Sequence, residues 1–318
     1  MSPQYYEDKV GALRDMFGTE VIELDGDSLR VDDRRYRIIN DVIVLLDDAG
    51  PVVPLFAEDI RLTFGAEWQA FPHVLPEHRL EFDAYFDLVN LAGLANARVC
   101  DLGCGNGRWS YFLVQHCREM VLIDFSDAIH VARKNLAHHH NILFFQADLT
   151  DLPFRPGFAD FAFSLGVLHH LPTPALNAVR TLKDVAPQTL VYLYYALDNR
   201  SAHFRALLSL ITAVRRIMSR VRSQRVRIAF TWLVAATVYE PMIALGRAAD
   251  RMGAARHVPL YDSYAGKSFR RIRQDVYDRF FTRIEQRVTR AEILNLRDSF
   301  REIEVSPNWP YWHFICRV

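Results

Sequence analysis

Three glycines at alternate positions follow an aspartate at the end of an apolar run: Asp101, Gly103, Gly105 and Gly107. Glycine is favoured where the backbone must take a positive φ angle or pass close to a ligand. The spacing therefore predicts a tight turn between a strand and a helix, wrapped around a small molecule. A dinucleotide-binding turn, G-x-G-x-x-G, would need a third glycine where this chain has Arg108. The spacing argues against a nicotinamide cofactor, although a glycine-rich loop that binds nothing has the same composition.

A further aspartate ends the next apolar run along the chain. Asp124 closes residues 120–124, and in doubly wound α/β folds an acidic residue about twenty positions after the glycine turn accepts hydrogen bonds from ribose hydroxyls. Asp124 could instead cap the helix that follows. We predict that it binds a ribose.

The segment D-x-G-x-G-x-G resembles motif I of the class I S-adenosylmethionine-dependent methyltransferases. Asp148 and Leu149 resemble that family's adenine-contacting segment, and residues 164–171, SLGVLHHL, resemble the end of its fourth strand. The resemblance covers about 97–197, with four motifs in the family's order. It implies S-adenosyl-L-methionine as the cofactor and assigns its binding to a set of residues: Asp101, Gly103, Cys104, Gly105, Gly107, Asp124, Phe125, Asp148, Leu149 and Leu165.

Methyl transfer from a sulfonium is an in-line displacement, so the protein must position the acceptor and manage its proton. The candidate bases follow the fourth and fifth predicted strands: His169, His170 and Tyr195, with Tyr194 and Asp198 nearby in the sequence. A histidine with a pKa near neutrality can take a proton from a hydroxyl or amine as it attacks. Either histidine could instead pack or cap a helix. We expect no metal ion.

The elements that must position these residues alternate strand and helix over residues 97–197, which predicts a parallel sheet with helices on both faces. Residues 302–306 and 312–318 add an antiparallel hairpin at the edge. The fold class is therefore α/β, and the resemblance implies a Rossmann-like, seven-stranded sheet of the class I methyltransferase type. We assign residues 97–198 and 259–318 to this core.

Residues 1–60 form a separate β-rich module in our prediction, with two or three antiparallel strands around turn-rich pairs. Residues 36–46, YRIINDVIVLL, resemble the end of a zinc-ribbon-like head found in many natural-product and sugar-pathway methyltransferases, but no cysteine precedes Cys100. A tetrahedral zinc site needs four nitrogen or sulfur ligands, so we expect a head without zinc.

Residues 61–96 hold an aromatic segment and a lead-in helix over 77–94. Phe64 and Trp68 belong to the aromatic segment. They are candidates for a lid over the cofactor pocket, with Trp68 contacting the substrate. Aromatic packing that docks the head onto the core is the alternative.

Residues 199–258 interrupt the core with apolar residues at helical spacing, and Pro241 is a site for a kink. No acidic residue occurs between Asp198 and Glu240, whereas eight arginines do. We expect a helical cover above the active site, with the arginines on the face opposite the apolar one. A homodimer seam, an anionic membrane surface and nucleic acid are the alternative partners.

The stretch after this insertion combines aromatic and polar side chains, as an orientation-specific pocket requires. Asp278 and Thr282 fit a D-x-x-x-T pattern that faces the substrate in related methyltransferases, although Arg283 replaces the usual proline. We therefore predict that Tyr264, Asp278 and Arg283 bind the substrate. A structural network among apolar neighbours is the alternative.

Composition sets few limits: 318 residues, 50% of them hydrophobic, can bury one large core with appendages, and the net charge is zero. Four cysteines without a CxxC pair favour a reducing cytoplasm, and the N-terminus lacks the pattern of a secretory signal. The apolar run over 228–239 is short for a bilayer span, so we expect no integral membrane segment.

Together these features predict a cytoplasmic enzyme that transfers a methyl group from S-adenosyl-L-methionine to an oxygen or nitrogen atom of a small molecule, in secondary-metabolite or sugar biosynthesis. We expect a small-molecule substrate and no nucleic acid, and leave open a homodimer and peripheral contact with a membrane. The alternatives are a catalytically silent S-adenosylmethionine-binding subunit, a methyltransferase of membrane-associated substrates and a nicotinamide oxidoreductase.

Overall fold

The computed structural model describes residues 5–46 and 55–318, and the chain divides into two compact units. One comprises Met1–Tyr195 and Gln286–Val318, and the other comprises Ala196–Glu285. We call them the sheet unit and the helical unit, and describe each by itself.

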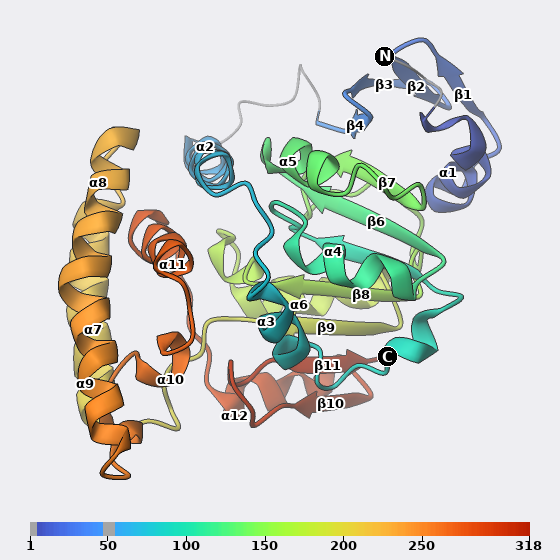
Figure 1. Cartoon of the computed structure of the whole chain (residues 1–318). Coiled ribbons are helices and arrows are strands. Elements are labelled where there is room, and N and C mark those ends of the chain that lie inside the picture. Colours follow the sequence, from blue (N-terminus) through green and yellow to red (C-terminus); the bar gives the residue numbers. More distant parts are fainter. Residues whose placement is uncertain (1–4, 47–54) are drawn as a thin grey trace. The chain divides into compact units, whose positions relative to one another are not determined.

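The sheet unit is built on five parallel strands and an antiparallel hairpin (Figure 1). The parallel strands are β5 (Arg98–Leu102), β6 (Glu119–Asp124), β7 (Ile142–Gln146), β8 (Phe161–Leu165) and β9 (Gln188–Tyr192), and the hairpin is β10 (Glu302–Val305) with β11 (Phe314–Arg317). Their order across the sheet is β7-β6-β5-β8-β9-β11-β10. This arrangement confirms the predicted α/β fold.

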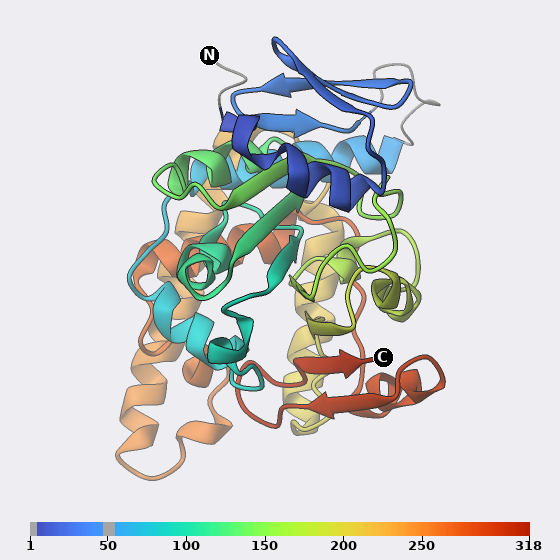
Figure 2. The same cartoon turned by 90° about the vertical axis from the view of Figure 1, so that its right-hand side faces the viewer.

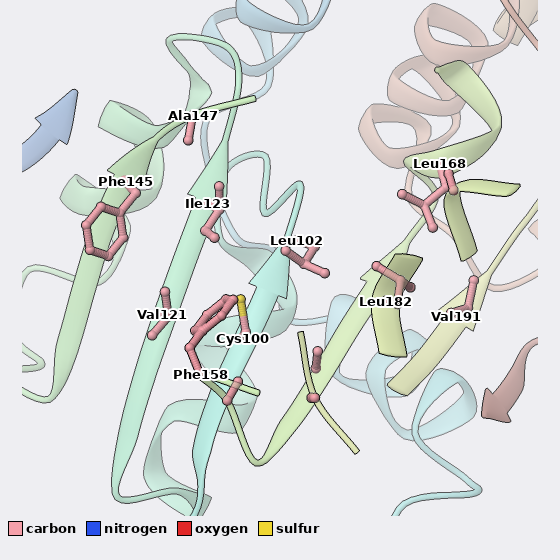
Figure 3. Close-up of a cluster of buried hydrophobic side chains, with 14 of the residues drawn as sticks. Cys100, Leu102, Val121, Ile123, Phe145, Ala147, Phe158, Leu168, Leu182 and Val191 are labelled. Atoms are coloured by element: carbon pink, nitrogen blue, oxygen red, sulfur yellow. The ribbon is translucent and has the colours of Figure 1, made fainter. Parts of the chain in front are cut away.

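The parallel strands are mostly apolar because both faces of the sheet are covered, and Arg98 and Asp101 of β5 are buried exceptions. Every residue of β5, β7 and β8 is buried. Successive side chains alternate between two hydrophobic clusters: Cys100 and Val121 belong to the first, Val99 and Met120 to the second. Figure 3 shows part of the first cluster, with side chains from neighbouring strands lying together.

Helices supply the other half of each cluster. The first face carries α1 (Val10–Phe17), α6 (Ala175–Thr181) and α12 (Arg290–Leu294). The second carries α3 (His78–Tyr85), α4 (Arg108–Leu113) and α5 (Ala128–Asn135). Short 3₁₀ turns complete the unit: η2 (Glu7–Lys9), η3 (Leu91–Leu94), η4 (Val114–His116), η5 (Leu168–His170), η6 (Leu182–Asp184) and η9 (Asn295–Asp298).

The N-terminal strands continue the central sheet, which corrects our prediction of a separate module over 1–60. They are β1 (Ile22–Asp25), β2 (Ser28–Val31), β3 (Arg34–Ile39) and β4 (Val42–Val44), a four-stranded meander whose last strand pairs in parallel with β7. Figure 2 shows this meander and the C-terminal hairpin at opposite edges of the sheet. The physical reason is that β4 and β7 each satisfy the other's otherwise unpaired edge. Residues 47–54 of the predicted module lie outside the described part.

Buried polar side chains fasten this head to the parallel strands. The hydroxyl of Tyr5 donates to the carbonyl of Ile142 at 2.8 Å, and that of Tyr6 donates to the carbonyl of Phe144 in β7 at 3.3 Å. Arg98, buried at the start of β5, forms an ion pair with Asp15 of α1 at 2.5 Å. The head is therefore held by hydrogen bonds, an ion pair and sheet pairing.

Two helices connect the head to β5. They are α2 (Leu55–Ala70) and α3, with η3 after them. The single helix predicted over 77–94 is wrong, because the helix ends at Tyr85 and only the 3₁₀ turn Leu91–Leu94 follows.

The helical unit is longer than predicted. It contains α7 (Ala202–Met218), α8 (Gln224–Val234), the π-helical segment η7 (Ala235–Tyr239), α9 (Glu240–Asp250), η8 (Ala255–His257), α10 (Tyr261–Tyr264) and α11 (Phe269–Phe281). We predicted an insertion over 199–258 and placed 259–285 in the core, but the unit runs from Ala196 to Glu285. The reason is α11, whose Phe280 and Phe281 pack on Phe230 of α8 at ring distances of 5.2 and 5.7 Å.

Arg215 of α7 and Arg227 of α8 are buried, contrary to the prediction that the arginines of residues 199–258 lie on the face opposite the apolar one. Arg215 donates to the carbonyls of Thr282 and Arg283 at the end of α11. Arg227 donates to the hydroxyl of Tyr277 at 3.2 Å. Both guanidinium groups satisfy polar atoms inside the unit, as buried charges require.

Candidate functional site

The glycine turn follows β5 directly and leads into α4, as predicted. Gly103, Gly105 and Gly107 have φ angles of 84°, 56° and 75°, which confirms that glycine is needed there. A Cβ at Gly103 would lie 2.5 Å from the side chain of Val167, and one at Gly105 would lie 2.7 Å from the indole of Trp68. The turn is thus too crowded, as well as too strained, for a side chain.

Asp124 is buried at the carboxyl end of β6 and faces this turn. Its Oδ2 accepts from the backbone N–H of Gly105 at 2.8 Å, and its Oδ1 accepts from the N–H and hydroxyl of Ser126 at 2.8 and 2.7 Å. A carboxylate has about four acceptor positions, so three bonds leave one for a ligand hydroxyl. Burial raises the pKa of Asp124. The donor set therefore fits one ribose hydroxyl, in addition to a structural role in fixing the turn.

Asp101 lies one residue before the end of β5, fully buried beneath the turn. Burial raises its pKa to about 8, against the opposing effect of the Ser110 hydroxyl, which donates to its Oδ2 at 2.5 Å. The charge of Asp124 raises this pKa further. Asp101 is therefore largely protonated at neutral pH, and its bond to Ser110 joins β5 to α4.

The remaining predicted cofactor residues line the same edge of the sheet. Cys104 lies within the turn, Phe125 follows β6, and Leu165 ends β8. Asp148 follows β7 and accepts from the N–H and hydroxyl of Thr150, and Leu149 packs against the first cluster. Because the strands are parallel, their carboxyl ends meet at this edge, where ligands bind in open α/β sheets.

The aromatic segment of α2 lies over this edge. Phe64 contacts His170 with 5.2 Å between ring centroids, and Trp68 rests on the glycine turn. The guanidinium of Arg108, the first residue of α4, lies 5.1 Å from the Trp68 ring. These contacts place both aromatic residues where a lid would lie and also account for packing, so the two interpretations of the segment stand.

The two predicted histidines form η5 after β8. His169 is fully buried and stacks on Tyr194 with 4.0 Å between ring centroids. The ring centroids of His169 and His170 are 4.1 Å apart. Within the part of the chain that the structure describes, neither ring nitrogen of His169 has a hydrogen-bond partner. Burial lowers the pKa of His169 well below its ordinary value, so the imidazole is neutral at physiological pH.

Tyr194, rather than Tyr195, lies beside the histidines. The Tyr195 ring lies near Tyr311 and Trp312, at 5.6 and 6.4 Å, and packs on the first cluster. Neighbouring residues of an extended chain point to opposite sides, so only one of the two tyrosines can reach His169. Tyr195 stays a prediction as a catalytic residue, and the structure places it apart from the pair.

Arg287 completes the surroundings of Tyr194. Its guanidinium lies 5.2 Å from the Tyr194 ring and donates to the carbonyl of Tyr195 at 3.0 Å. The preceding Gln286 donates its backbone N–H to the carbonyl of His169 at 3.0 Å. No sequence signal points to Gln286 or Arg287 as a partner of this site, because both lie about a hundred residues after the histidines and tyrosines in the sequence.

The other predicted substrate residues belong to the helical unit. Tyr264 is buried, and Arg279 donates to its hydroxyl at 3.4 Å. Asp278 lies on α11 and its carbonyl accepts from the hydroxyl of Thr282, while the side chain of Arg283 is exposed. Their role in substrate binding stays a prediction. Among the described residues, no group of three His, Cys, Asp or Glu side chains is placed to hold a metal ion.

Comparison with known proteins identifies the central part of the sheet unit. Residues 99–187 match a family model described as a methyltransferase domain. The 23S rRNA (uracil(1939)-C(5))-methyltransferase RlmD of Pseudomonas fluorescens is 35% identical over 105 residues, which make up 32% of this chain and 23% of that protein. The chain thus spans less than a quarter of this curated relative's length.

Two solved structures resemble part of the chain. The N-methyltransferase NodS of Bradyrhizobium japonicum, in complex with S-adenosyl-L-homocysteine, is 22% identical, with a TM-score of 0.32 over 36% of this chain and 61% of that chain. The PH0226 protein of Pyrococcus horikoshii is 22% identical, with a TM-score of 0.37 over 46% and 70%. Scores of this size carry no inference, so the identification rests on the family match.

Proposed function

We propose that this chain, whose residues 99–187 form a class I S-adenosylmethionine-dependent methyltransferase domain, transfers a methyl group to an oxygen or nitrogen atom of a small molecule. One observation carries the proposal. The glycine turn, which faces Asp124, touches Val167, and Val167 immediately precedes the turn that presents His169 and His170. Candidate cofactor and base residues therefore adjoin one another at the same edge of the sheet.

The cofactor fits the residues at this edge. When bound, S-adenosylmethionine supplies an electrophilic methyl group on a sulfonium. Gly103 and Gly105 let the backbone approach a ligand closely, and the free acceptor position of Asp124 suits a ribose hydroxyl.

The histidine pair suits the removal of a proton. An oxygen or nitrogen acceptor attacks with its own lone pair and must lose a proton. Burial, the neighbouring His170 and Arg287 all lower the pKa of His169, so its imidazole is neutral and a ring nitrogen has a free lone pair for that proton. The same lowering makes His169 a weaker base than an ordinary histidine. Stacking on Tyr194 fixes the plane of the imidazole. We assign the base to His169 or His170.

The thiols argue against one route to a carbon acceptor, in which a cysteine thiolate first adds to the substrate ring and so activates the carbon. Each of the four cysteines is buried, and burial raises their thiol pKa values, to about 12 for Cys117 and Cys316. A reactive thiolate needs a lowered pKa and access to its target. Methylation of a uracil carbon, the reaction in the curated relative's name, is therefore the weaker hypothesis here.

For the substrate we propose a secondary metabolite or a sugar, bound through Trp68 and through Tyr264, Asp278 and Arg283. The side-chain chemistry of these four residues supports the assignment, because aromatic walls with a few charged groups recognise small polar molecules. Two further hypotheses stay open: a catalytically silent S-adenosylmethionine-binding subunit, and a methyltransferase of membrane-associated substrates. A cytoplasmic location is part of the proposal.

The test combines binding with turnover. Calorimetry of the purified chain should show micromolar binding of S-adenosylmethionine and S-adenosylhomocysteine and no binding of NAD. A screen of small molecules and RNA that records S-adenosylhomocysteine release should then find turnover with a hydroxyl or amine compound. Cofactor binding without turnover on any compound would support the silent subunit, and turnover on RNA alone would contradict a small-molecule substrate.

A further inference from the structure

The helical unit exposes large apolar side chains in a regular pattern on α7. Leu210 and Ile217 are 62% and 67% exposed, and Val214 lies between them. Residues three or four apart lie on one side of a helix, so these three form a continuous apolar stripe. Exposed leucines scattered singly need no explanation, whereas a stripe on one helix face marks an interaction surface.

After Arg225, the exposed sides of α8 and of the π-helical segment η7 that follows it are also uncharged and largely apolar. Between Arg225 and Glu240 the exposed side chains carry no charge, because the single charged residue there, Arg227, is buried. Trp232 and Leu233 are 53% and 60% exposed. The uncharged exposed set is Val226, Ala229, Trp232, Leu233, Ala236, Thr237 and Val238.

Arginines gather beside these apolar faces. Arg216, Arg220, Arg222 and Arg225 are all exposed around the connection between α7 and α8. Within the described residues none of the four forms an ion pair, and residues 199–239 contain no Asp or Glu. Both helices therefore present apolar side chains together with a cluster of positive charge.

We propose that this surface, the exposed sides of α7 and α8 with their four arginines, binds the face of an anionic lipid bilayer. Charge complementarity selects this occupant. A second copy of the chain would bring arginines against arginines. A nucleic acid would pair with the arginines but leave Leu210, Ile217 and Leu233 without a partner, whereas a bilayer takes apolar side chains below its headgroups and pairs arginines with anionic lipid. The proposal stands apart from the methyl-transfer activity.

The geometry favours a helix that lies on the membrane over one that crosses it. Within the described residues, Gln224–Asp250 is one helix of 27 residues that is long and apolar enough to span a bilayer, by length and composition only. Its inner side, however, bonds to α11: Arg227 donates to Tyr277, and Arg273 donates to the hydroxyl of Thr231 at 3.2 Å. A spanning arrangement would break these bonds and place a guanidinium in hydrocarbon.

Vesicle flotation of the full chain tests the proposal. One set of vesicles is phosphatidylcholine alone, and in the other a quarter of the lipid is phosphatidylglycerol. We expect binding to the anionic vesicles, at least about tenfold weaker binding to the neutral ones, and release at high salt. Alkaline carbonate should also release the protein, and resistance to carbonate would overturn the peripheral arrangement in favour of a span.

Two variants separate the apolar and charged parts of the surface. The apolar variant combines Leu210→Ser, Ile217→Ser and Leu233→Ser, and its control is Leu80→Ser, at a 75% exposed leucine on α3. The charge variant combines Arg216→Gln, Arg220→Gln, Arg222→Gln and Arg225→Gln, and its control is Arg297→Gln with Arg301→Gln, both exposed in the sheet unit. Each variant should lose binding at least about tenfold while the controls bind like the unaltered chain.

Circular dichroism and melting curves establish that the variants fold, since every substituted side chain is exposed. Equal binding by folded variants and unaltered chain would overturn the proposal, as would an unaltered chain that ignores both kinds of vesicle. A dimer in sedimentation velocity that Leu233→Ser disperses would assign the surface to a second copy. If RNA displaces the chain from vesicles and still binds the apolar variant, the surface would be assigned to nucleic acid.

Discussion

The imidazole of His169 stacks on the phenol ring of Tyr194, with 4.0 Å between the ring centroids and 30° between their planes. The guanidinium of Arg287 lies 5.2 Å from the same phenol ring. A neutral imidazole, an aromatic support and a cation thus follow one another at the carboxyl end of the sheet. This arrangement restrains the imidazole of His169, one of the two histidines that we propose as the base.

If His169 is the base, His169→Ala should lower turnover by about a hundredfold or more, the range of a lost general base, while S-adenosylhomocysteine affinity changes little. Tyr194→Leu should lower turnover less, since it removes only the support of the imidazole. The comparison variant is Tyr195→Leu, whose ring lies near Tyr311 and Trp312, and a larger loss of turnover there than in Tyr194→Leu would support the predicted catalytic role of Tyr195. Loss of turnover only in His170→Ala would move the role to the neighbouring histidine.

Asp124→Asn should weaken S-adenosylhomocysteine binding, measured by calorimetry, by about 1–3 kcal/mol, the size of a lost hydrogen bond to a charged group. Asp151→Asn, an exposed aspartate after β7, is the control and should bind like the unaltered chain. Unchanged affinity in Asp124→Asn would remove the ribose assignment and leave only its role in fixing the turn.

Gly105→Ala tests the crowding of the turn. Gly157 has a similar positive φ of 65°, but a Cβ there would meet nothing within 4 Å. Gly157→Ala should therefore cost only backbone strain, about 1 kcal/mol, whereas Gly105→Ala should cost more because its methyl group collides with Trp68. Chemical denaturation measures both, and equal losses would show that the indole moves aside freely.

Asp101→Asn should flatten part of the pH dependence of stability. The folded carboxyl has a pKa of about 8, against 3.8 as the ordinary value. The folded state thus keeps a proton that the unfolded state loses, so its stabilising effect is complete below about pH 4 and is lost as the pH rises to about 8. Urea unfolding at pH 5 and 8 measures how far the free energy of unfolding falls between these pH values. This fall should be smaller in the variant, by the order of a few kcal/mol. Parallel pH profiles would contradict a raised pKa.

Asp278→Ala and Arg283→Ala should each lower turnover about tenfold or more if these residues orient the substrate, with cofactor affinity nearly unchanged. Arg270→Ala, at an exposed position of the same helix α11, is the control. A joint fall of turnover, cofactor affinity and melting temperature would instead identify the two residues as structural.

The parallel sheet and the glycine turn could be predicted because their signals are local. Apolar runs of four to six residues indicate strands buried on both faces, and the spacing of Gly103, Gly105 and Gly107 indicates positive φ angles at alternate residues. The position of Asp124 beside the glycine turn could be predicted in the same way, because it lies at the end of the next strand.

What the sequence did not reveal depends on distant pairing. The meander alternates apolar and polar residues in the way a free-standing module does, and nothing in β4 specifies β7 as its neighbour. The end of the helical unit was misplaced because α11 owes its position to Phe230, some fifty residues earlier. The choice between Tyr194 and Tyr195 required knowing which side of an extended segment faces the histidines.

The parallel pairing of β4 with β7 also constrains how the chain can fold as it is made. Ile43 and Phe145 are register partners, yet about one hundred residues separate them. At a synthesis rate of about 5–20 residues per second, the edge of β4 waits roughly 5–20 seconds for its partner to leave the ribosome. During this interval the nascent head presents the open edge of β4 to other chains. We therefore expect chaperones to act before β4 pairs with β7, more than at the later pairing of β10 with β11.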